Sequence, residues 1–443
     1  MAEVLIIGAG PAGQAAALTL AEHGIACTML DEQQRPGGQI LRQPPKAFRI
    51  SNWLPGQSYT ALKARLVAFE ALPGFQPGHS VLAVRAHDSG FEVVTNRASF
   101  AASHVLIAGG CMDLAVPLPG WTLPGVMAAG GLQAFVKAQG YIPGSRVLLA
   151  GTHPLMLLVA EQIHSAGGTV AGICFAQPQA TMLQALAAHA HAALAGLSTL
   201  AQAAAAYARL RAAGIPIRFN SPLAALEGQG RAEAARLADG TRIAADTIGL
   251  CYGFVPQSDL PRAAGVRMRR AGPAGGWAAC HDDWQQTNIP GLFVAGETTG
   301  VAGAVAAAAS GTLAGLGLVR ALGHALPDAA PTRRALAAAR RFAALLDAAA
   351  DPRPHFPAPG PDTLICRCED VRLDALAAAR VHGQSANALK LVTRCGMGLC
   401  QGRNCEPSLL RLLCGPDDPG FAARFPARPV AISDLLDPQR TLP

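Results

Sequence analysis

Three observations predict an α/β protein with two nucleotide-binding units and a small, mainly helical C-terminal domain. A short apolar strand at residues 4–7 runs into a glycine-rich turn and an alanine-rich helix. A second strand, turn and helix follow at residues 145–164. Two close pairs of cysteines lie after residue 360. Strands that alternate with helices are typical of parallel sheets, and the cysteine pairs mark a separate C-terminal unit.

The N-terminal turn has the glycine spacing of a dinucleotide-binding motif. Gly8 makes the turn, Gly10 lets a pyrophosphate approach the backbone, and Gly13 lets the helix pack on the strand. A second apolar run, residues 26–30, ends in Asp31, whose carboxylate can accept hydrogen bonds from a ribose. Strand, turn, helix and terminal acid together predict a dinucleotide site.

The residues after Asp31 indicate that the dinucleotide is FAD. Arg35-Pro-Gly-Gly38-Gln39 has the RxGG pattern of FAD proteins with two dinucleotide domains, a pattern that nicotinamide dehydrogenases lack. Residues 105–110 and 287–297 resemble the strands that leave and re-enter such an FAD domain. We therefore expect a glutathione-reductase-like flavoprotein. The residues expected to bind FAD are Gly8, Gly10, Pro11, Gly13, Asp31, Glu32, Arg35, Gly38, Gln39, Val84, Ala108, Gly109, Gly296 and Glu297.

The second nucleotide-fold pattern lacks the residues that bind a nucleotide. His153 stands where an open glycine turn would let phosphate approach the backbone. The following strand, residues 169–175, ends in Ala176 and Gln177, with neither a carboxylate for a ribose nor an arginine for a 2′-phosphate. We expect a Rossmann-like domain that is kept for its shape, and the missing fingerprint disfavours NAD(P)H binding. A single histidine in a turn is more often structural than functional.

Four C-terminal cysteines are arranged as a CxC pair and a CxxxxC pair. Four thiolates hold an iron–sulfur cluster, and the glycines between the pairs let backbone N–H groups approach the sulfides. We expect a [2Fe-2S] cluster in which each motif supplies a pair of thiolates. The expected ligands are Cys366, Cys368, Cys400 and Cys405.

Two other interpretations of these cysteines remain open. A zinc site with four cysteine ligands fits a CxC pair poorly, and the thiols could also be small buried hydrophobes. Cys395 lies near Cys400, but its spacing makes it the odd member, so we expect it not to be a ligand. Cys414 is expected to serve packing.

Composition excludes several classes of protein. The net charge is +7, but the arginine clusters have no interleaved aromatics, so no nucleic-acid partner is expected. The apolar stretch at residues 301–319 follows the FAD return strand, and we expect a buried helix and no integral membrane segment. Eleven cysteines and a strand that begins at residue 3 predict a cytoplasmic protein, with any membrane association through partners.

Catalytic motifs of two other classes are missing from the sequence. No redox CxxC or CxxxxC lies beside Gly38 or in the middle domain, which argues against a disulfide reductase. Neither GxSxG nor HExxH occurs, so hydrolysis has no support. A flavin and a cluster on one chain are instead equipment for electron transfer.

A proline-rich segment, residues 352–361, marks the linker before the cysteine domain. The tail after it is expected to wrap a neighbour or stay loose. The expected division is 1–117 and 246–330 for the FAD-binding domain, 118–245 for the Rossmann-like domain, 331–362 for a helix and linker, 363–415 for the [2Fe-2S] domain and 416–443 for the tail.

The ordered motifs resemble a known family over nearly the full chain. They are GPAGQ with RPGGQI, then LPGWTLPGVMAAGG at residues 118–131, then CRCED and GMGLCQGRNC. This combination resembles the α (A-type) subunit of heteromeric FAD-dependent amino-acid and opine dehydrogenases, which include opine oxidase, D-hydroxyproline dehydrogenase and hydrogen cyanide synthase. The C-terminal part resembles bacterioferritin-associated ferredoxin.

The resemblance implies a protein that helps to oxidise the CH–NH bond of an amino acid or opine. It also implies a catalytic FAD-containing β subunit and a small ferredoxin-like γ subunit as partners, with electrons passing to an external acceptor. The alternatives are a self-sufficient NAD(P)H-dependent flavin reductase, a hydrogen cyanide synthase subunit that oxidises glycine, and a C-terminal domain that only binds or delivers a cluster. No catalytic residue is assigned.

Overall fold

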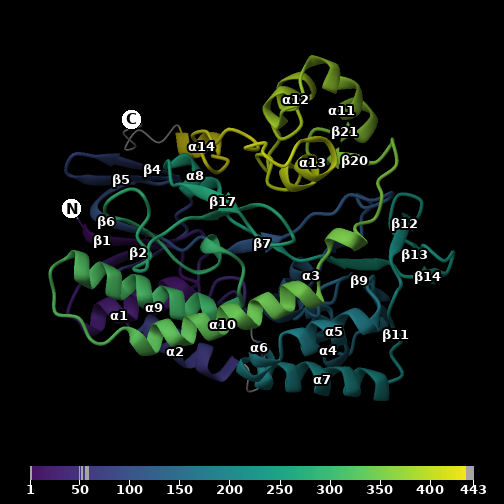
Figure 1. Cartoon of the computed structure of the whole chain (residues 1–443), viewed down its shortest axis with the longest axis horizontal. Helices are drawn as coiled ribbons and strands as arrows, with labels where there is room; N and C mark the ends of the chain where they lie inside the picture. The colour runs from purple at the N-terminus through teal and green to yellow at the C-terminus, as the bar shows by residue number, and fades with distance from the viewer. Residues whose placement is uncertain (1, 49, 51–52, 55–58, 436–443) are drawn as a thin grey trace.

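The computed structural model describes residues 2–48, 50, 53–54 and 59–435, and it contains two parallel-sheet units with a helical domain above them (Figure 1). The first sheet has the order β3-β2-β1-β6-β5-β4, and β19 also pairs with β6. β4 and β5 form an antiparallel hairpin, and β5 is also antiparallel to β6. The other strand pairs of this sheet are parallel. The strands are β1 (Ala2–Ile7), β2 (Cys27–Asp31), β3 (Phe75–Pro77), β4 (Val81–His87), β5 (Gly90–Thr95), β6 (Ser99–Ile107) and β19 (Leu292–Val294).

Helices α1 (Pro11–Glu22) and α9 (Gly303–Ala321) pack closely on one another beside this sheet, and α2 (Thr60–Glu70) lies against α1. Small residues make the close approach possible. A Cβ on Gly311 would lie 2.0 Å from the carbonyl oxygen of Ala12. α9 is long and apolar enough to cross a membrane, but 67% of that window is buried inside the protein. It is therefore a core helix of the first unit.

The second sheet has the order β11-β10-β9-β15-β8, with all its strands parallel. The expected boundary at residue 245 assigned β15 to the FAD domain, and this is wrong because β15 pairs with both β9 and β8. A short buried strand looks the same in sequence whichever sheet it joins. The strands are β8 (Val126–Ala128), β9 (Val147–Gly151), β10 (Val170–Phe175), β11 (Ile217–Arg218) and β15 (Thr247–Cys251).

Helices surround the second sheet, and a small antiparallel sheet packs beside it. The helices are α3 (Ala129–Gln139), α4 (Leu155–Ser165), α5 (Gln179–Ala188), α6 (Ala190–Ala195) and α7 (Leu197–Ala212), and the small sheet consists of β12 (Leu223–Glu227), β13 (Ala234–Leu237) and β14 (Arg242–Ala244). Helix α10 (Ala330–Ala349) lies against α9 of the first unit and against α5 and α6 of the second, as Figure 1 shows. It therefore ties the two units together.

Short elements connect the units near the C-terminal domain. Two-stranded pairs are formed by β7 (Cys111–Asp113) with β16 (Phe254–Pro256) and by β17 (Met268–Arg270) with β18 (Trp277–Ala279). Single turns of helix are α8 (Asp259–Ala263), η2 (Gly296–Thr299) and η3 (Arg353–His355).

The C-terminal domain contains a two-stranded sheet and three short α-helices. Its elements are β20 (Leu364–Cys366), β21 (Val371–Arg372), α11 (Leu373–Ala379), η4 (Arg380–His382), α12 (Ala386–Thr393) and α13 (Glu406–Leu413). The following segment returns to the first unit, where the backbone N–H of Ala427 donates to the carbonyl of Leu82 in β4, before α14 (Ile432–Leu435). The described part of the tail therefore wraps its own chain.

The contact between α1 and α9 generates the first prediction. Gly311→Ala places a methyl group against the Ala12 carbonyl and should cost about 1–3 kcal/mol of unfolding free energy through overpacking. Val305→Ala on the same helix is the control, because Val305 is 71% exposed and should change stability by less than about 0.5 kcal/mol. Chemical denaturation measures both, and a Gly311→Ala protein as stable as the control would contradict the packing argument.

Candidate functional site

The glycine turn between β1 and α1 leaves no room for side chains at Gly8 and Gly13. A Cβ on Gly8 would lie 2.4 Å from the carbonyl oxygen of Ala108, and one on Gly13 would lie 1.9 Å from that of Gly8. Gly10 is the N-cap of α1, and as a glycine it has no side chain to cap the helix. The positive end of the helix and its first N–H groups are therefore open, and they fit the pyrophosphate of a dinucleotide.

The RxGG segment closes over this turn. A Cβ on Gly38 would lie 2.9 Å from the Cα of Gly10, so the segment can approach the turn this closely only because residue 38 is glycine. Arg35 donates from Nη1 to the carbonyl oxygen of Pro44 at 2.9 Å. In the described structure this arginine holds the far end of its own loop.

Asp31 holds the glycine turn with one carboxylate oxygen and the loop that follows it with the other. Oδ2 accepts from the backbone N–H of Ala9 and Oδ1 from that of Gln33, each at 2.7 Å. Burial raises the pKa of Asp31, and the two backbone hydrogen bonds oppose that rise. The expected ribose acceptor thus also fastens β2 to the turn, a role that sequence spacing did not reveal.

Glu297 follows β19 and lies just before α9. Its Oε1 accepts from the backbone N–H of Gly303 at 2.7 Å, and its Oε2 accepts from the thiol of Cys111. Burial and the neighbouring Glu297 raise the pKa of Cys111 well above its usual value. Nearby, the hydroxyl of Thr298 is buried without a hydrogen-bond partner and faces Gly109. An unpaired buried hydroxyl here fits a site whose ligand completes it.

Most residues expected to bind FAD lie together at one edge of the first sheet. They lie in α1 or just beyond the carboxyl ends of β1, β2, β6 and β19. These are Gly8, Gly10, Pro11, Gly13, Asp31, Glu32, Arg35, Gly38, Gln39, Ala108, Gly109, Gly296 and Glu297. Val84 differs, because it is 5% exposed and packs in the core from β4. Sequence reasoning missed Cys111 and Thr298, whose only signal was their position beside Gly109 and Glu297.

Protein groups fill the nucleotide edge of the second sheet. The Nδ1 of His153 accepts from the backbone N–H of Leu155 at 3.1 Å, so the imidazole caps α4 where a phosphate would bind. Its ring meets Phe254 edge-on at 5.2 Å between centroids. Gln177 donates from Nε2 to the carbonyl oxygens of Thr152 at 2.7 Å and Ala349 at 3.1 Å. The hydroxyl of Thr152 and the Oε1 of Gln177 are buried at this edge without a hydrogen-bond partner, and the expectation that this unit does not bind NAD(P)H stays a prediction.

The C-terminal cysteines converge in two groups. Cys366, Cys395 and Cys405 are 2%, 0% and 1% exposed, and their sulfur atoms all lie within 4.8 Å of one another. Cys368 is exposed, and its thiol contacts that of Cys400. Each group therefore combines cysteines from the CxC and CxxxxC motifs, although the sequence suggested that each motif supplies its own pair of ligands.

Glycines keep the cysteine loops compact. A Cβ on Gly396 would lie 2.4 Å from the ring of Phe421, and one on Gly398 would lie 2.4 Å from the Cβ of Cys368. The N–H of Gly396 donates to the sulfur of Cys366 at 3.5 Å. The glycines expected to admit sulfides thus also make room for Phe421, and the converging thiols fit a metal or cluster with sulfur ligands.

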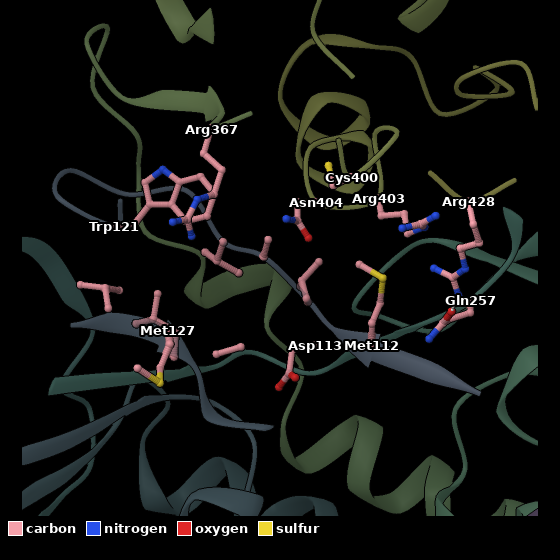
Figure 2. A pocket seen from close by; sticks show the side chains of 16 residues that line it. Met112, Asp113, Trp121, Met127, Gln257, Arg367, Cys400, Arg403, Asn404 and Arg428 are labelled. Atoms are coloured by element: carbon pink, nitrogen blue, oxygen red, sulfur yellow. Dashed lines mark hydrogen bonds between the residues drawn. The ribbon is translucent and has the colours of Figure 1, made fainter. Parts of the chain in front are cut away.

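A chamber of about 390 Å³ separates the Cys400 loop from β7, and Figure 2 shows it. Cys400, Arg403 and Asn404 lie on its upper side, and Met112 and Asp113 lie below them. β7 begins at Cys111, which contacts Glu297 at the expected flavin site. The chamber therefore lies between the cysteine loop and the strand that leaves the flavin site.

The walls of this chamber carry charge of both signs. Asp113 accepts from the N–H of Gly130 at 3.0 Å, and burial raises its pKa. On the opposite side Arg428 donates to the side-chain oxygen of Gln257, and burial lowers the pKa of Arg428. A carboxyl group and a guanidinium group thus lie on opposite sides of the chamber.

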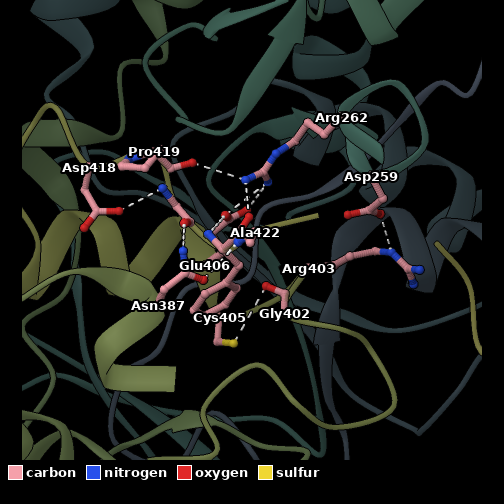
Figure 3. Close-up of polar contacts among 12 residues, drawn as sticks. Asp259, Arg262, Asn387, Gly402, Arg403, Cys405, Glu406, Asp418, Pro419 and Ala422 are labelled. Carbon is pink, nitrogen blue, oxygen red and sulfur yellow. Dashed lines mark hydrogen bonds and ion pairs between the residues drawn. The ribbon is translucent and has the colours of Figure 1, made fainter. Parts of the chain in front are cut away.

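A buried ion pair holds the cysteine domain on the first unit, as Figure 3 shows. Arg262 of α8 donates from Nη1 to both carboxylate oxygens of Glu406, at 3.1 and 3.0 Å, and each side chain is 12% exposed. Arg403 donates from Nε to Asp259 at 2.6 Å. Glu406 and Arg403 flank Cys405 in sequence, so both contacts position that cysteine relative to α8.

The family of the chain follows from comparison with known proteins. The family model described as pyridine nucleotide-disulphide oxidoreductase matches residues 2–311. The chain belongs to this family. Within it, the opine oxidase A subunit of Rhizobium meliloti (strain 1021) is 33% identical over 98% of each chain. Hydrogen cyanide synthase subunit HcnB of Pseudomonas protegens is also 33% identical, over 97% of this chain and 96% of that protein.

A solved structure supports the fold of this chain. The L-proline dehydrogenase from P. horikoshii has a TM-score of 0.71 with 18% sequence identity, and the match covers 98% of this chain and 79% of that one. The expected flavoprotein fold and the resemblance to opine oxidase A subunits are thus confirmed. The chain is a flavin-dependent oxidoreductase with FAD as its cofactor, and the individual FAD-binding residues stay predictions.

The second prediction tests the glycine turn. Gly10→Val should abolish FAD retention, because its side chain would occupy the space through which the pyrophosphate reaches the N-terminus of α1. Flavin absorbance per chain measures this, and the far-ultraviolet circular dichroism spectrum reports folding. Gly415→Ala, at a position with open space around it, is the control for flavin content. A folded Gly10→Val protein with wild-type flavin content would exclude this turn as the site.

The third prediction concerns pH. Burial lowers the pKa of His153 from 6.5 to about 4, so the neutral imidazole stabilises the fold above pH 6.5, and this contribution is lost as pH falls toward 4. The wild-type protein should lose roughly 2 kcal/mol of unfolding free energy between pH 7 and pH 4.5 through His153, and His153→Gln should abolish this loss. Chemical denaturation at several pH values measures it, with His164→Gln in the last turn of α4 as the control. Identical pH profiles for the two variants would contradict this account.

Proposed function

We propose that this chain is the FAD- and [2Fe-2S]-containing subunit of a heteromeric dehydrogenase. The enzyme oxidises the CH–NH bond of an amino acid or an N-substituted amino acid, such as an opine or D-hydroxyproline. Its proposed partners are a catalytic FAD-containing β subunit and a small ferredoxin-like γ subunit. Full-length similarity to the opine oxidase A subunit supports the assignment. Because none of the eleven cysteines forms a disulfide, we place the assembly in the cytoplasm.

The observation that carries this proposal is the placement of the cysteine loop opposite the flavin strand. Cys400 and Met112 line the same chamber, and β7 starts at the residue that contacts Glu297. The docking contacts of Arg262 and Arg403 hold the cysteine domain in this position. An electron that leaves the flavin edge of the first sheet would pass to the thiols across this chamber.

The two cofactors suit the electron count of the reaction. Oxidation of a CH–NH bond to C=N removes two electrons and two protons. A flavin accepts both electrons together, and a [2Fe-2S] cluster passes them singly to an external acceptor. Cys366, Cys368, Cys400 and Cys405 are the proposed cluster ligands, as the donor set for such a cluster is four thiolates.

Oxidation of glycine is the second candidate for the substrate. The chain is as similar to HcnB as to the opine oxidase A subunit, at 33% identity with each. Substrate comparison on the purified complex separates the two, because an opine dehydrogenase reduces a dye with opines and a hydrogen cyanide synthase does so with glycine.

A self-sufficient NAD(P)H-dependent reductase is disfavoured by His153 and Gln177, which occupy the nucleotide edge of the second sheet. Anaerobic mixing with micromolar NADH or NADPH should leave the flavin oxidised. Rapid bleaching of the flavin would favour the reductase instead.

The fourth prediction tests electron transfer through the cysteine domain. In the assembled complex, Cys400→Ala should lower amine-dependent dye reduction at least about tenfold, because the relay is broken, while substrate still reduces the flavin anaerobically. Cys27→Ala, in the first sheet far along the chain from the cysteine domain, is the control. Unchanged dye reduction after loss of the iron would mean that the cluster is structural, and the relay would be refuted.

A further inference from the structure

We propose that Cys395 is a reserve ligand, which serves the buried iron of the [2Fe-2S] cluster when Cys366 or Cys405 is lost, and that the exposed iron has no such reserve. This inference rests on the proposed cluster. The proposal states which thiols can replace one another as iron ligands. It gives a role to Cys395, which is not among the four proposed ligands.

Distances among the buried thiols support the proposal. Two thiolates on one tetrahedral metal with bonds of about 2.3 Å lie about 3.8 Å apart. The sulfur atoms of Cys366, Cys395 and Cys405 are all within 4.8 Å of one another, so a small side-chain rotation brings any two of them to that spacing. Three thiols therefore stand where one iron takes two.

The outer pair of thiols is different. Cys368 and Cys400 contact each other, and Cys368 is exposed. Of the remaining described cysteines, Cys414 interacts with Asp418 in the tail segment and is not part of the buried group of three. Cys395 gathers with Cys366 and Cys405 and not with this outer pair, so loss of Cys368 or Cys400 would leave the outer iron with one thiolate.

Cys405 and Cys395 differ in their place on the helices. Cys405 is the N-cap of α13, and its thiol donates to the carbonyl oxygen of Gly402 in the cysteine loop. Cys395 follows the C-terminal end of α12. Cys395 is also fully buried among the apolar side chains of the domain.

Alanine variants test the inference, because serine could itself bind iron through oxygen. Four proteins are compared: Cys405→Ala, Cys400→Ala, and each of these combined with Cys395→Ala. The readouts are iron and acid-labile sulfide per chain, visible absorbance and the EPR spectrum of the reduced protein, none of which depends on turnover. Cys414→Ala is the control for loss of a thiol outside the group, and thermal unfolding monitors the fold of every variant.

The expected result is asymmetric. Cys405→Ala should keep at least about half of the wild-type iron, with a shifted EPR signal, and adding Cys395→Ala should reduce the iron about tenfold. The Cys400→Ala protein should lose the iron whether or not Cys395 is also replaced by alanine. Equal iron loss in Cys405→Ala and Cys400→Ala, or iron in Cys405→Ala that survives the second substitution, would overturn the reserve role. Zinc without iron in the wild-type protein would instead refute the proposed cluster itself.

Discussion

The ion pair between Arg262 and Glu406 is the contact on which the arrangement of this protein depends. Charges buried to this extent are costly to desolvate, and the cost is offset only when every hydrogen-bonding group finds a partner. Here the guanidinium also donates to the carbonyl oxygens of Pro419 and Phe421, and Glu406 accepts from the N–H of Phe421. The network joins α8, α13 and the tail segment, so the cysteine domain has one defined position on the first unit.

The position of the cysteine domain gives the unit built on the second sheet a structural function. Strand β8 of this sheet leads into α3, and its residues Val126, Met127 and Ala128 line the chamber beneath the Cys400 loop. The linker packs there as well, because Phe356 stacks on Tyr252 beyond β15 and Arg411 of α13 lies over the Phe356 ring at 3.8 Å. A unit with a nucleotide-binding fold thus supports the cysteine domain and forms part of the chamber wall.

Local sequence predicted those features that depend on neighbouring residues. The glycine turn, the residues that follow it and the buried helix expected at residues 301–319, which the structure places at Gly303–Ala321, were predicted because each is encoded within one strand–turn–helix unit. The boundary at residue 245 was wrong because β15 inserts between β9 and β8, which come much earlier in the chain. Parallel strand order is set by long-range packing, and no local pattern reports it.

The sequence by itself determined the family, the FAD fold and the set of thiols, because glycine spacing, terminal acids and cysteine motifs act over short stretches of chain. Only the tertiary structure decided how those parts meet. Cys395 lies with Cys366 and Cys405, and Cys368 lies with Cys400, because α12 and α13 fold the two motifs across one another around Phe421. Which side chains share a metal is set by distances between segments, and spacing along one segment does not contain that information.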